Sequence, residues 1–210
     1  MRVITELISA AMYAMLAQNF IFTGGYGASE AVRMAAKPKQ LYPMTFFITL
    51  FSTTVSVICV LLEQIAAVKR LSILGHAVEF IIVLTVMYII VLAISVLVFK
   101  AKDRTVRRIG MAAFNTLVIA VPFINYRAAF TIAQAIGSGI GSGFAFVIAV
   151  LLINVGLRRL DRNPNIPEAF KGTPAIFIYV SILSLCFSGF LRKRIDYVRA
   201  EQNAVSKQEC

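Results

Sequence analysis

Six stretches of this chain contain no Asp, Glu, Lys or Arg, and they constrain its fold more than any other feature. They span residues 7–29, 40–62, 80–99, 109–126, 128–157 and 172–191, and together they hold 134 of the 210 residues. All 31 charged residues therefore lie in the remaining 76. A helix of about 20 mostly apolar residues crosses the core of a bilayer. The pattern predicts an all-α integral membrane protein with six transmembrane helices, and it excludes a soluble enzyme and a disordered protein.

The charge of the chain fits the same interpretation. The formal net charge is +11, and 59% of the residues are hydrophobic. In a soluble protein so basic a chain would indicate nucleic-acid binding. In a membrane protein, Lys and Arg instead mark cytoplasmic loops and contacts with anionic lipid. We therefore expect the lipid bilayer as a partner and no nucleic acid.

The loops give the orientation only weakly. The first, third and fifth loops carry twelve Lys and Arg residues, and the opposite side carries nine when the carboxyl-terminal tail is included. The excess places both termini outside the cytoplasm. The amino-terminal segment resembles a signal peptide, but Glu6 interrupts its charged part and the apolar run continues past Ala17 to Phe22. We therefore expect a retained first helix.

The chain reads as one membrane domain over residues 1–210, built from two halves. The first half covers about residues 1–104, the second about 105–191, and a polar tail covers 192–210. Each half has three helices, so the second must be inverted across the membrane relative to the first. The domain is therefore predicted to consist of two inverted three-helix repeats.

The first helix of each half contains residues that interrupt helices. Interrupted helices at matching places in inverted halves point to a binding site near the midplane. The alternative is that Gly and Pro are simply common in membrane helices. Both interpretations stay open from the residues alone. The candidate residues for an ion path or helix break are Asn19, Gly24, Gly25 and Gly27 in the first helix, and Pro122, Asn125 and Arg127 in the fourth.

The fifth stretch contains four glycines at alternating positions: Gly137, Gly139, Gly141 and Gly143. They resemble a dinucleotide-binding fingerprint, but the third glycine is misplaced and no strand is expected before them. Small residues four apart allow two helix backbones to approach closely in lipid. We therefore expect these glycines to serve helix packing.

Few titratable residues suggest chemistry. Glu6, Glu63 and Glu79 lie at the ends of the predicted helices, where interfacial water is the ordinary explanation. His76 is the only histidine, and a lone histidine in a charged loop is typical of the surface. Arg127 follows the predicted break, and a snorkelling side chain is the ordinary interpretation. No catalytic residue, no metal ligand and no proton relay of buried carboxylates is predicted.

Four segments of the carboxyl-terminal third carry a resemblance to a known family. They are Gly141–Leu152, Gly156–Leu160, Ile166–Pro174 and Leu183–Phe190, and the Asn19-Phe20 pair with Gly27 adds to them. Together they resemble the Rnf/Nqr membrane subunit family, and within it the RnfA/NqrE type. The chain departs from the family pattern at Gln18, Ala169 and Lys171. The specific motifs are confined to about residues 18–29 and 141–190.

The resemblance implies a multi-pass subunit of an ion-translocating electron-transport complex in the bacterial inner membrane. It also implies other membrane subunits as partners, among them a homologous subunit of inverted orientation that shares an iron–sulfur cluster. The family's cluster cysteines would correspond to Ser29 and to a position between Ile119 and Phe123, in the Pro122 region. Neither place holds a cysteine, and thiolates are the usual ligands of such clusters. We therefore expect no cluster bound by this chain's own cysteines.

Two further functions remain open. The first is a free-standing inverted-repeat transporter without a redox function, which the missing cysteines favour. The second is a purely structural membrane partner. The ion, the electron donor and acceptor, and the partner are not specified by the sequence.

Overall fold

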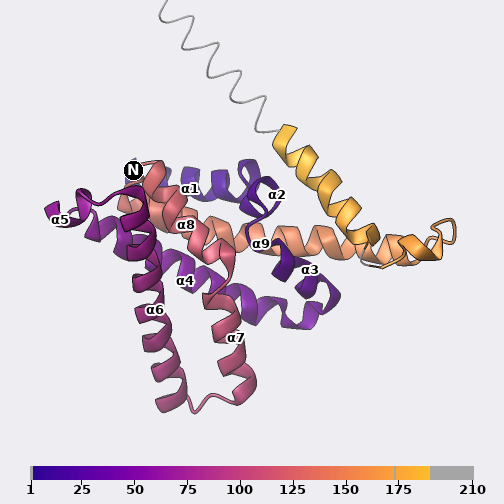
Figure 1. Ribbon diagram of the computed structural model, residues 1–210, viewed down its shortest axis with the longest axis horizontal. Coiled ribbons are helices and arrows are strands. Elements are labelled where there is room, and N and C mark those ends of the chain that lie inside the picture. The colour runs from indigo at the N-terminus through magenta and orange to yellow at the C-terminus, as the bar shows by residue number, and fades with distance from the viewer. Residues whose placement is uncertain (1, 173, 190–210) are drawn as a thin grey trace, which may run out of the picture.

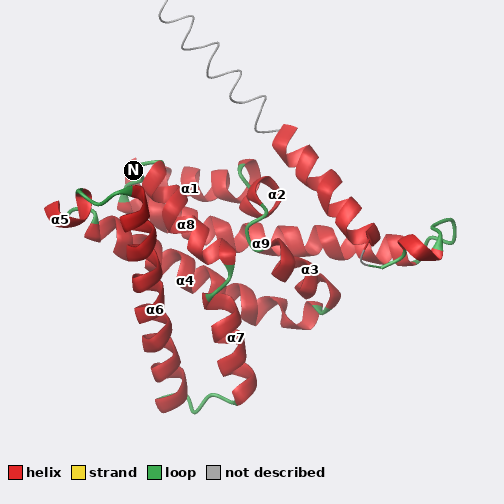
Figure 2. Ribbon diagram, in the orientation of Figure 1, coloured by secondary structure: helices red, strands yellow, loops and turns green. Residues whose placement is uncertain are grey.

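A computed structural model describes residues 2–172 and 174–189, and every regular element in this part of the chain is helical (Figures 1 and 2). The polar tail 192–210 lies outside the described residues. The elements are α1 (Arg2–Met12), a π-helical turn (Tyr13–Ala17), α2 (Phe20–Gly24), α3 (Ala28–Ala36), a short 3-10 turn (Pro38–Gln40), α4 (Leu41–Leu62), α5 (Ala66–Lys69), α6 (Ile73–Leu97), α7 (Asp103–Ala113), α8 (Thr116–Arg127), α9 (Ile132–Asp161), a second 3-10 turn (Glu168–Phe170) and a final helix over Pro174–Gly189.

Four of these helical stretches are long and apolar enough to cross a membrane. They are Pro38–Leu62, Ile73–Leu97, Asp103–Arg127 and Ile132–Asp161. Two shorter apolar helices, Val3–Leu16 and Pro174–Gly189, lie at the two ends of the described chain. The first is shorter than its charge-free stretch because the chain leaves the helix at Gln18 and Asn19. The structure therefore shows an all-helical membrane architecture with four full-length candidate spans.

α9 is the central helix, and its glycines bring two neighbours into backbone contact (Figure 1). A Cβ on Gly137 would lie 2.2 Å from the Leu7 carbonyl oxygen, and one on Gly141 would lie 2.5 Å from that of Ala11. On the α4 side, a Cβ on Gly139 or Gly143 would collide with Thr53 or Thr49. α9 therefore packs against α1 through one pair of glycines and against α4 through the other.

The hairpin of α6 and α7 projects from this bundle (Figure 1). Only 11% of the most apolar part of α6 is buried, although it has the highest mean hydropathy of the candidate spans. Large side chains such as Ile82, Ile89 and Leu97 are more than half exposed. A surface of this kind is stable against lipid or another apolar surface rather than against water.

The final helix packs against α2 and α9. Ser184 donates a hydrogen bond to the Phe22 carbonyl, and the rings of Phe22 and Phe187 stack at 4.8 Å. The Tyr179 hydroxyl donates to the Leu152 carbonyl at 3.2 Å. This helix is thereby attached to both α2 and α9.

Candidate functional site

The first helix interruption is organised by Asn19. Its Oδ1 accepts a hydrogen bond from the Ile21 amide at 3.2 Å and caps α2, and its Nδ2 donates to the Ala145 carbonyl of α9 at 3.2 Å. The side chain is fully buried. Asparagine is a preferred residue at a helix amino terminus because its oxygen accepts an otherwise unpaired amide. Asn19 therefore restarts the helix and fixes the restart to α9.

The second interruption lies at Phe114 and Asn115, between α7 and α8. Asn115 repeats the geometry of Asn19, because its Oδ1 accepts from the amide two residues later, that of Leu117, at 2.9 Å. The predicted break at Pro122 is wrong in position, since Pro122 lies inside α8, which runs on to Arg127. A proline within a membrane helix is tolerated when neighbouring helices satisfy the freed backbone groups.

The turn between α2 and α3 touches the second interruption. The Gly27 amide donates to the Thr116 Oγ1 at 2.7 Å. A Cβ on Gly27 would lie 2.7 Å from the Asn115 Oδ1, and its φ of +75° is one that other residues adopt at a cost. We call this meeting point of Gly27, Asn115 and Thr116 the interruption contact. Only glycine fits there without displacing the cap of α8.

The other residues expected at the breaks have different surroundings. Gly25 has a φ of +71° and ends α2, and a Cβ on it would meet nothing within 4 Å. A Cβ on Gly24 would collide with the Tyr26 ring. Asn125 is buried in α8, and neither polar atom of its side chain has a hydrogen-bond partner within the described chain. Arg127 is exposed at the end of α8 and lines a cavity of about 430 Å³.

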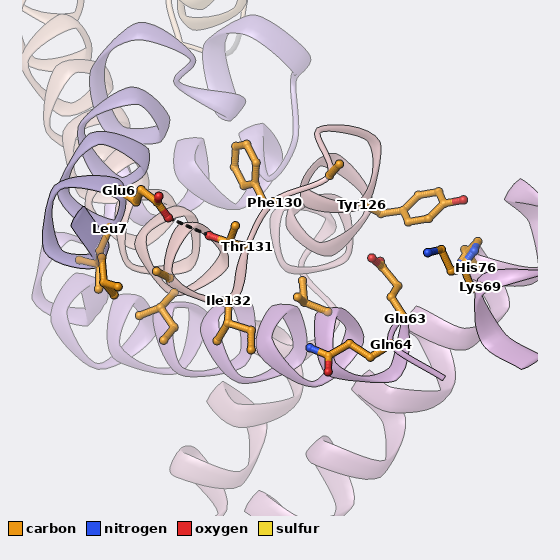
Figure 3. A pocket seen from close by; sticks show the side chains of 15 residues that line it. Glu6, Leu7, Glu63, Gln64, Lys69, His76, Tyr126, Phe130, Thr131 and Ile132 are labelled. Atoms are coloured by element: carbon orange, nitrogen blue, oxygen red, sulfur yellow. Dashed lines mark hydrogen bonds between the residues drawn. The ribbon is translucent and has the colours of Figure 1, made fainter. Parts of the chain in front are cut away.

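A larger cavity of about 970 Å³ opens at the end of the bundle where α1 and α9 begin and α4 and α8 end. Figure 3 shows that its polar side chains lie mainly at two ends of the cavity. Glu6 lies at one end, where its Oε2 accepts a hydrogen bond from Thr131 at 3.3 Å. Glu63, Lys69, His76 and Tyr126 gather at the other end. The remaining lining is mostly apolar, so these side chains supply most of its charge.

His76 is not a surface residue, contrary to the expectation from its position in a charged segment. It lies in the first turns of α6, is 1% exposed, and its Nδ1 is 3.0 Å from the Glu79 Oε2. The Tyr126 ring of α8 lies against it, with ring centroids 4.0 Å apart. The residue is buried because α8, distant in sequence, covers this turn of α6.

Glu63 ends α4 and lines the cavity beside His76. Burial raises the pKa of its carboxyl group above the ordinary value, the Glu79 carboxylate adds to the rise, and His76 opposes it. One side-chain oxygen each of Glu63 and Glu79, and Nε2 of His76, are buried with no hydrogen-bond partner among the described residues. We call Glu63, His76 and Glu79 the His76 cluster. Helix-end positions alone gave no signal of it, because the three side chains meet only when α4 and α6 pack.

Possible metal ligands are not grouped in the described part of the chain. No set of three or more His, Cys, Asp or Glu side chains there could hold a metal ion. Cys59 is buried in α4 and Cys186 is exposed in the final helix, so neither lies at the interruption contact. Ser29 is in the first turn of α3, and the residues of the interruption contact offer amide and hydroxyl groups.

No family model matches this chain. It is 35% identical to the A subunit of the proton-translocating ferredoxin:NAD(+) oxidoreductase complex of Clostridium ljungdahlii over 80 residues. This match covers 38% of this chain and 41% of that protein. It is 39% identical to the A subunit of the ion-translocating oxidoreductase complex of Aromatoleum aromaticum over 75 residues. This match covers 36% of this chain and 38% of that protein. These matches span about two fifths of the relatives' lengths.

A match to the corresponding protein of Proteus mirabilis is longer and weaker. It has 24% identity over 190 residues, which cover 89% of this chain and 96% of that protein. The chain is therefore similar, more strongly over a short segment and distantly over most of its length, to the A subunits of ion-translocating oxidoreductase complexes.

Proposed function

We propose that this protein is an integral membrane subunit of an Rnf/Nqr-like ion-translocating electron-transport complex. The observation that carries the proposal is the similarity to the A subunits of ion-translocating oxidoreductase complexes, which extends over 89% of the chain. The apolar helices and the exposed apolar surface of the α6–α7 hairpin support a place in the membrane beside other subunits. A homologous subunit of inverted orientation is the proposed neighbour.

We further propose six membrane helices in two inverted repeats, with α1 and α7 as the first segments of the interrupted helices. The matching caps support this arrangement. Asn19 and Asn115 each accept from the amide two residues on, and each restarts a helix after an interruption. In this arrangement the interruption contact joins the turn between α2 and α3 of the first repeat to the cap of α8 in the second.

The proposed subunit binds no iron–sulfur cluster through its own cysteines. Iron in such clusters is held by thiolates, whereas the interruption contact offers the Thr116 hydroxyl and the Asn115 amide. The Gly27 amide already occupies the Thr116 oxygen. No step of electron transfer is therefore assigned to this chain. Its role in the complex is to shape the path of the ion and to bind the neighbouring subunits.

Purification from the native membrane tests the proposal. Other membrane subunits of a redox complex are expected to co-purify with the chain, and the separated chain is expected to lack iron and visible absorption. The measurements are mass spectrometry of the co-purifying proteins, iron analysis and a visible spectrum. A stable homo-oligomer without any redox partner would contradict the subunit role. Iron bound by the isolated chain would contradict the missing cluster.

A free-standing transporter is the second candidate. The cavity of about 970 Å³ with its own ionisable side chains favours it, as does the absence of cysteine at the interruptions. Reconstitution of the chain alone into liposomes separates the two functions. A transporter moves a solute or ion without an electron donor, whereas an isolated subunit of a redox complex does not. A purely structural subunit would leave ion movement by the whole complex unchanged when Asn19 or Arg127 is replaced.

A further inference from the structure

We propose that the His76 cluster is a proton-binding site, in which Nε2 of His76 takes up a proton that reaches it from the cavity through the Glu63 carboxyl group. The inference goes beyond the proposed function, since it holds whether the chain acts in a complex or alone. It concerns a site away from the interruption contact.

The geometry first sets which nitrogen of His76 is free. An ionised carboxylate only accepts hydrogen bonds, so the Glu79 Oε2 at 3.0 Å places the hydrogen of the neutral ring on Nδ1. Nε2 then carries a lone pair. This atom is buried with no hydrogen-bond partner within the described chain, and His76 lines the cavity. A buried acceptor of this kind is satisfied by a proton or by a donor that enters the cavity.

The surroundings favour a proton. When Nε2 is protonated, the ring becomes a cation that needs acceptors, and Glu63 and Glu79 each have a buried oxygen without a partner. The Tyr126 ring, 4.0 Å away between centroids, stabilises a cation through its π face. Histidine is also the side chain that ordinarily gains and loses a proton near neutral pH.

Glu63 is placed to exchange the proton with the cavity. It lines the cavity, is partly exposed, and is electrostatically coupled to His76 and Glu79. Because burial raises the pKa of Glu63, this carboxyl group holds its proton to a higher pH than an exposed glutamate. The step is balanced: the Glu63 carboxylate takes a proton from hydronium in the cavity and leaves water, then gives the proton to Nε2 and is again a carboxylate, beside an imidazolium. The reverse step returns the proton.

Other charged groups face the cluster from the neighbouring elements. Lys69 of α5 lines the same end of the cavity, and its positive charge disfavours a further positive charge on the His76 ring. The Cys59 thiol of α4 is electrostatically coupled to both glutamates. Tyr126 of α8 presents its ring, and Glu6 of α1 lies at the far end beside Thr131 of α9. Two carboxylates, from Glu63 and Glu79, and one ammonium group, from Lys69, therefore surround His76.

The single histidine makes the test direct. We would label the histidine with ¹⁵N, place the full chain in lipid nanodiscs, and record the two ring nitrogens as a function of pH. We expect the neutral ring to carry its hydrogen on Nδ1, and Nε2 to become protonated reversibly as the pH is lowered. This measurement needs no variant. A neutral ring with its hydrogen on Nε2, or an Nε2 that never gains a proton while the protein stays folded, would overturn the proposal.

Two variants then separate the roles of the glutamates. In Glu79→Gln the preference for the Nδ1 tautomer is expected to be lost, because an amide both donates and accepts. In Glu63→Gln the tautomer is expected to remain, but proton exchange at Nε2 is expected to slow at least tenfold. Glu30→Gln is the matched control, since Glu30 pairs with Arg33 on α3 and does not line the cavity. Equal exchange rates in Glu63→Gln and Glu30→Gln would remove Glu63 from the path.

Discussion

The interruption contact and the His76 cluster both hold buried polar side chains, but they differ in how far those side chains are paired. At the interruptions, both polar atoms of the Asn19 side chain are used, and the Asn115 and Thr116 oxygens each accept a backbone amide, so that only Nδ2 of Asn115 is buried without a partner in the described chain. In the His76 cluster, each of the three side chains keeps a buried atom without a described partner. Paired groups hold a structure in place, whereas unpaired ones leave capacity for a ligand.

This difference favours the cavity over the helix breaks as the place where an ion or proton binds. The sequence leaves an ion path at the interruptions open, since backbone groups are freed where a helix breaks. In the structure the freed amides of Ile21, Gly27 and Leu117 are already bonded to side chains. The unpaired ionisable atoms lie instead where α4 ends and α6 begins.

The strongest way to break the interruption contact is Gly27→Ala. A left-handed backbone costs a residue other than glycine roughly 1–2 kcal/mol, and the new Cβ would also lie 2.7 Å from the Asn115 Oδ1. Gly25→Ala is the matched control, because Gly25 has a similar φ but an open surrounding. We expect Gly27→Ala to lower the stability clearly more than Gly25→Ala does. Equal losses would show that the second interruption does not depend on its close contact with Gly27.

The measurement uses the buried Cys59 thiol as a reporter of unfolding. With Cys186 and Cys210 replaced by serine, a thiol-reactive dye labels the folded protein slowly and the unfolded protein rapidly. The temperature at which labelling accelerates then gives the relative stability of each variant.

A loss of comparable size is expected at Asn19 when a paired asparagine is compared with an unpaired one. Asn19→Leu removes the cap of α2 and leaves the Ile21 amide and the Ala145 carbonyl without this partner, at a cost of about 1–3 kcal/mol. Asn125→Leu removes a buried amide that has no partner in the described chain, so it is expected to be neutral or stabilising. Both are read by the same Cys59 assay. A large loss in Asn125→Leu would reveal that Asn125 binds a water molecule or an ion.

The smallest effect is a pH-dependent one at Glu63. Because its pKa is raised in the folded state, the folded protein disfavours the ionised carboxylate relative to the unfolded chain. The penalty is absent below the ordinary glutamate value of about 4 and grows as the pH rises through the raised pKa. Glu63→Gln is therefore expected to be more stable than the native protein at neutral pH and equal to it at acidic pH. A variant less stable at neutral pH would contradict this environment for Glu63.

Local sequence patterns predict that the chain is a membrane protein and that the glycines of α9 serve helix packing. Charge-free stretches predict apolar helices because a charged side chain is costly in lipid at any point of a helix. The first interruption is also visible, because Asn19 is followed by three glycines within a few residues. These features depend on composition and spacing alone.

The second interruption could not be predicted from the sequence, because Asn115 lies within a charge-free stretch. Only the hydrogen bond by which Asn115 caps α8 identifies the break. Pro122 is the more conspicuous residue, yet α8 continues through it. The length of the first apolar helix is similarly decided by the break before Asn19, where α2 starts.

The sequence alone determined that this chain belongs in a membrane as apolar helices, because the cost of a charge in lipid acts on each residue independently. Only the tertiary structure decided that Gly27 touches the second interruption and that His76 is buried between Glu79 and Tyr126. The partners in these contacts come from helices far apart in the chain. Pairing of a buried polar group depends on the atoms that packing brings beside it, and no local pattern encodes that neighbourhood.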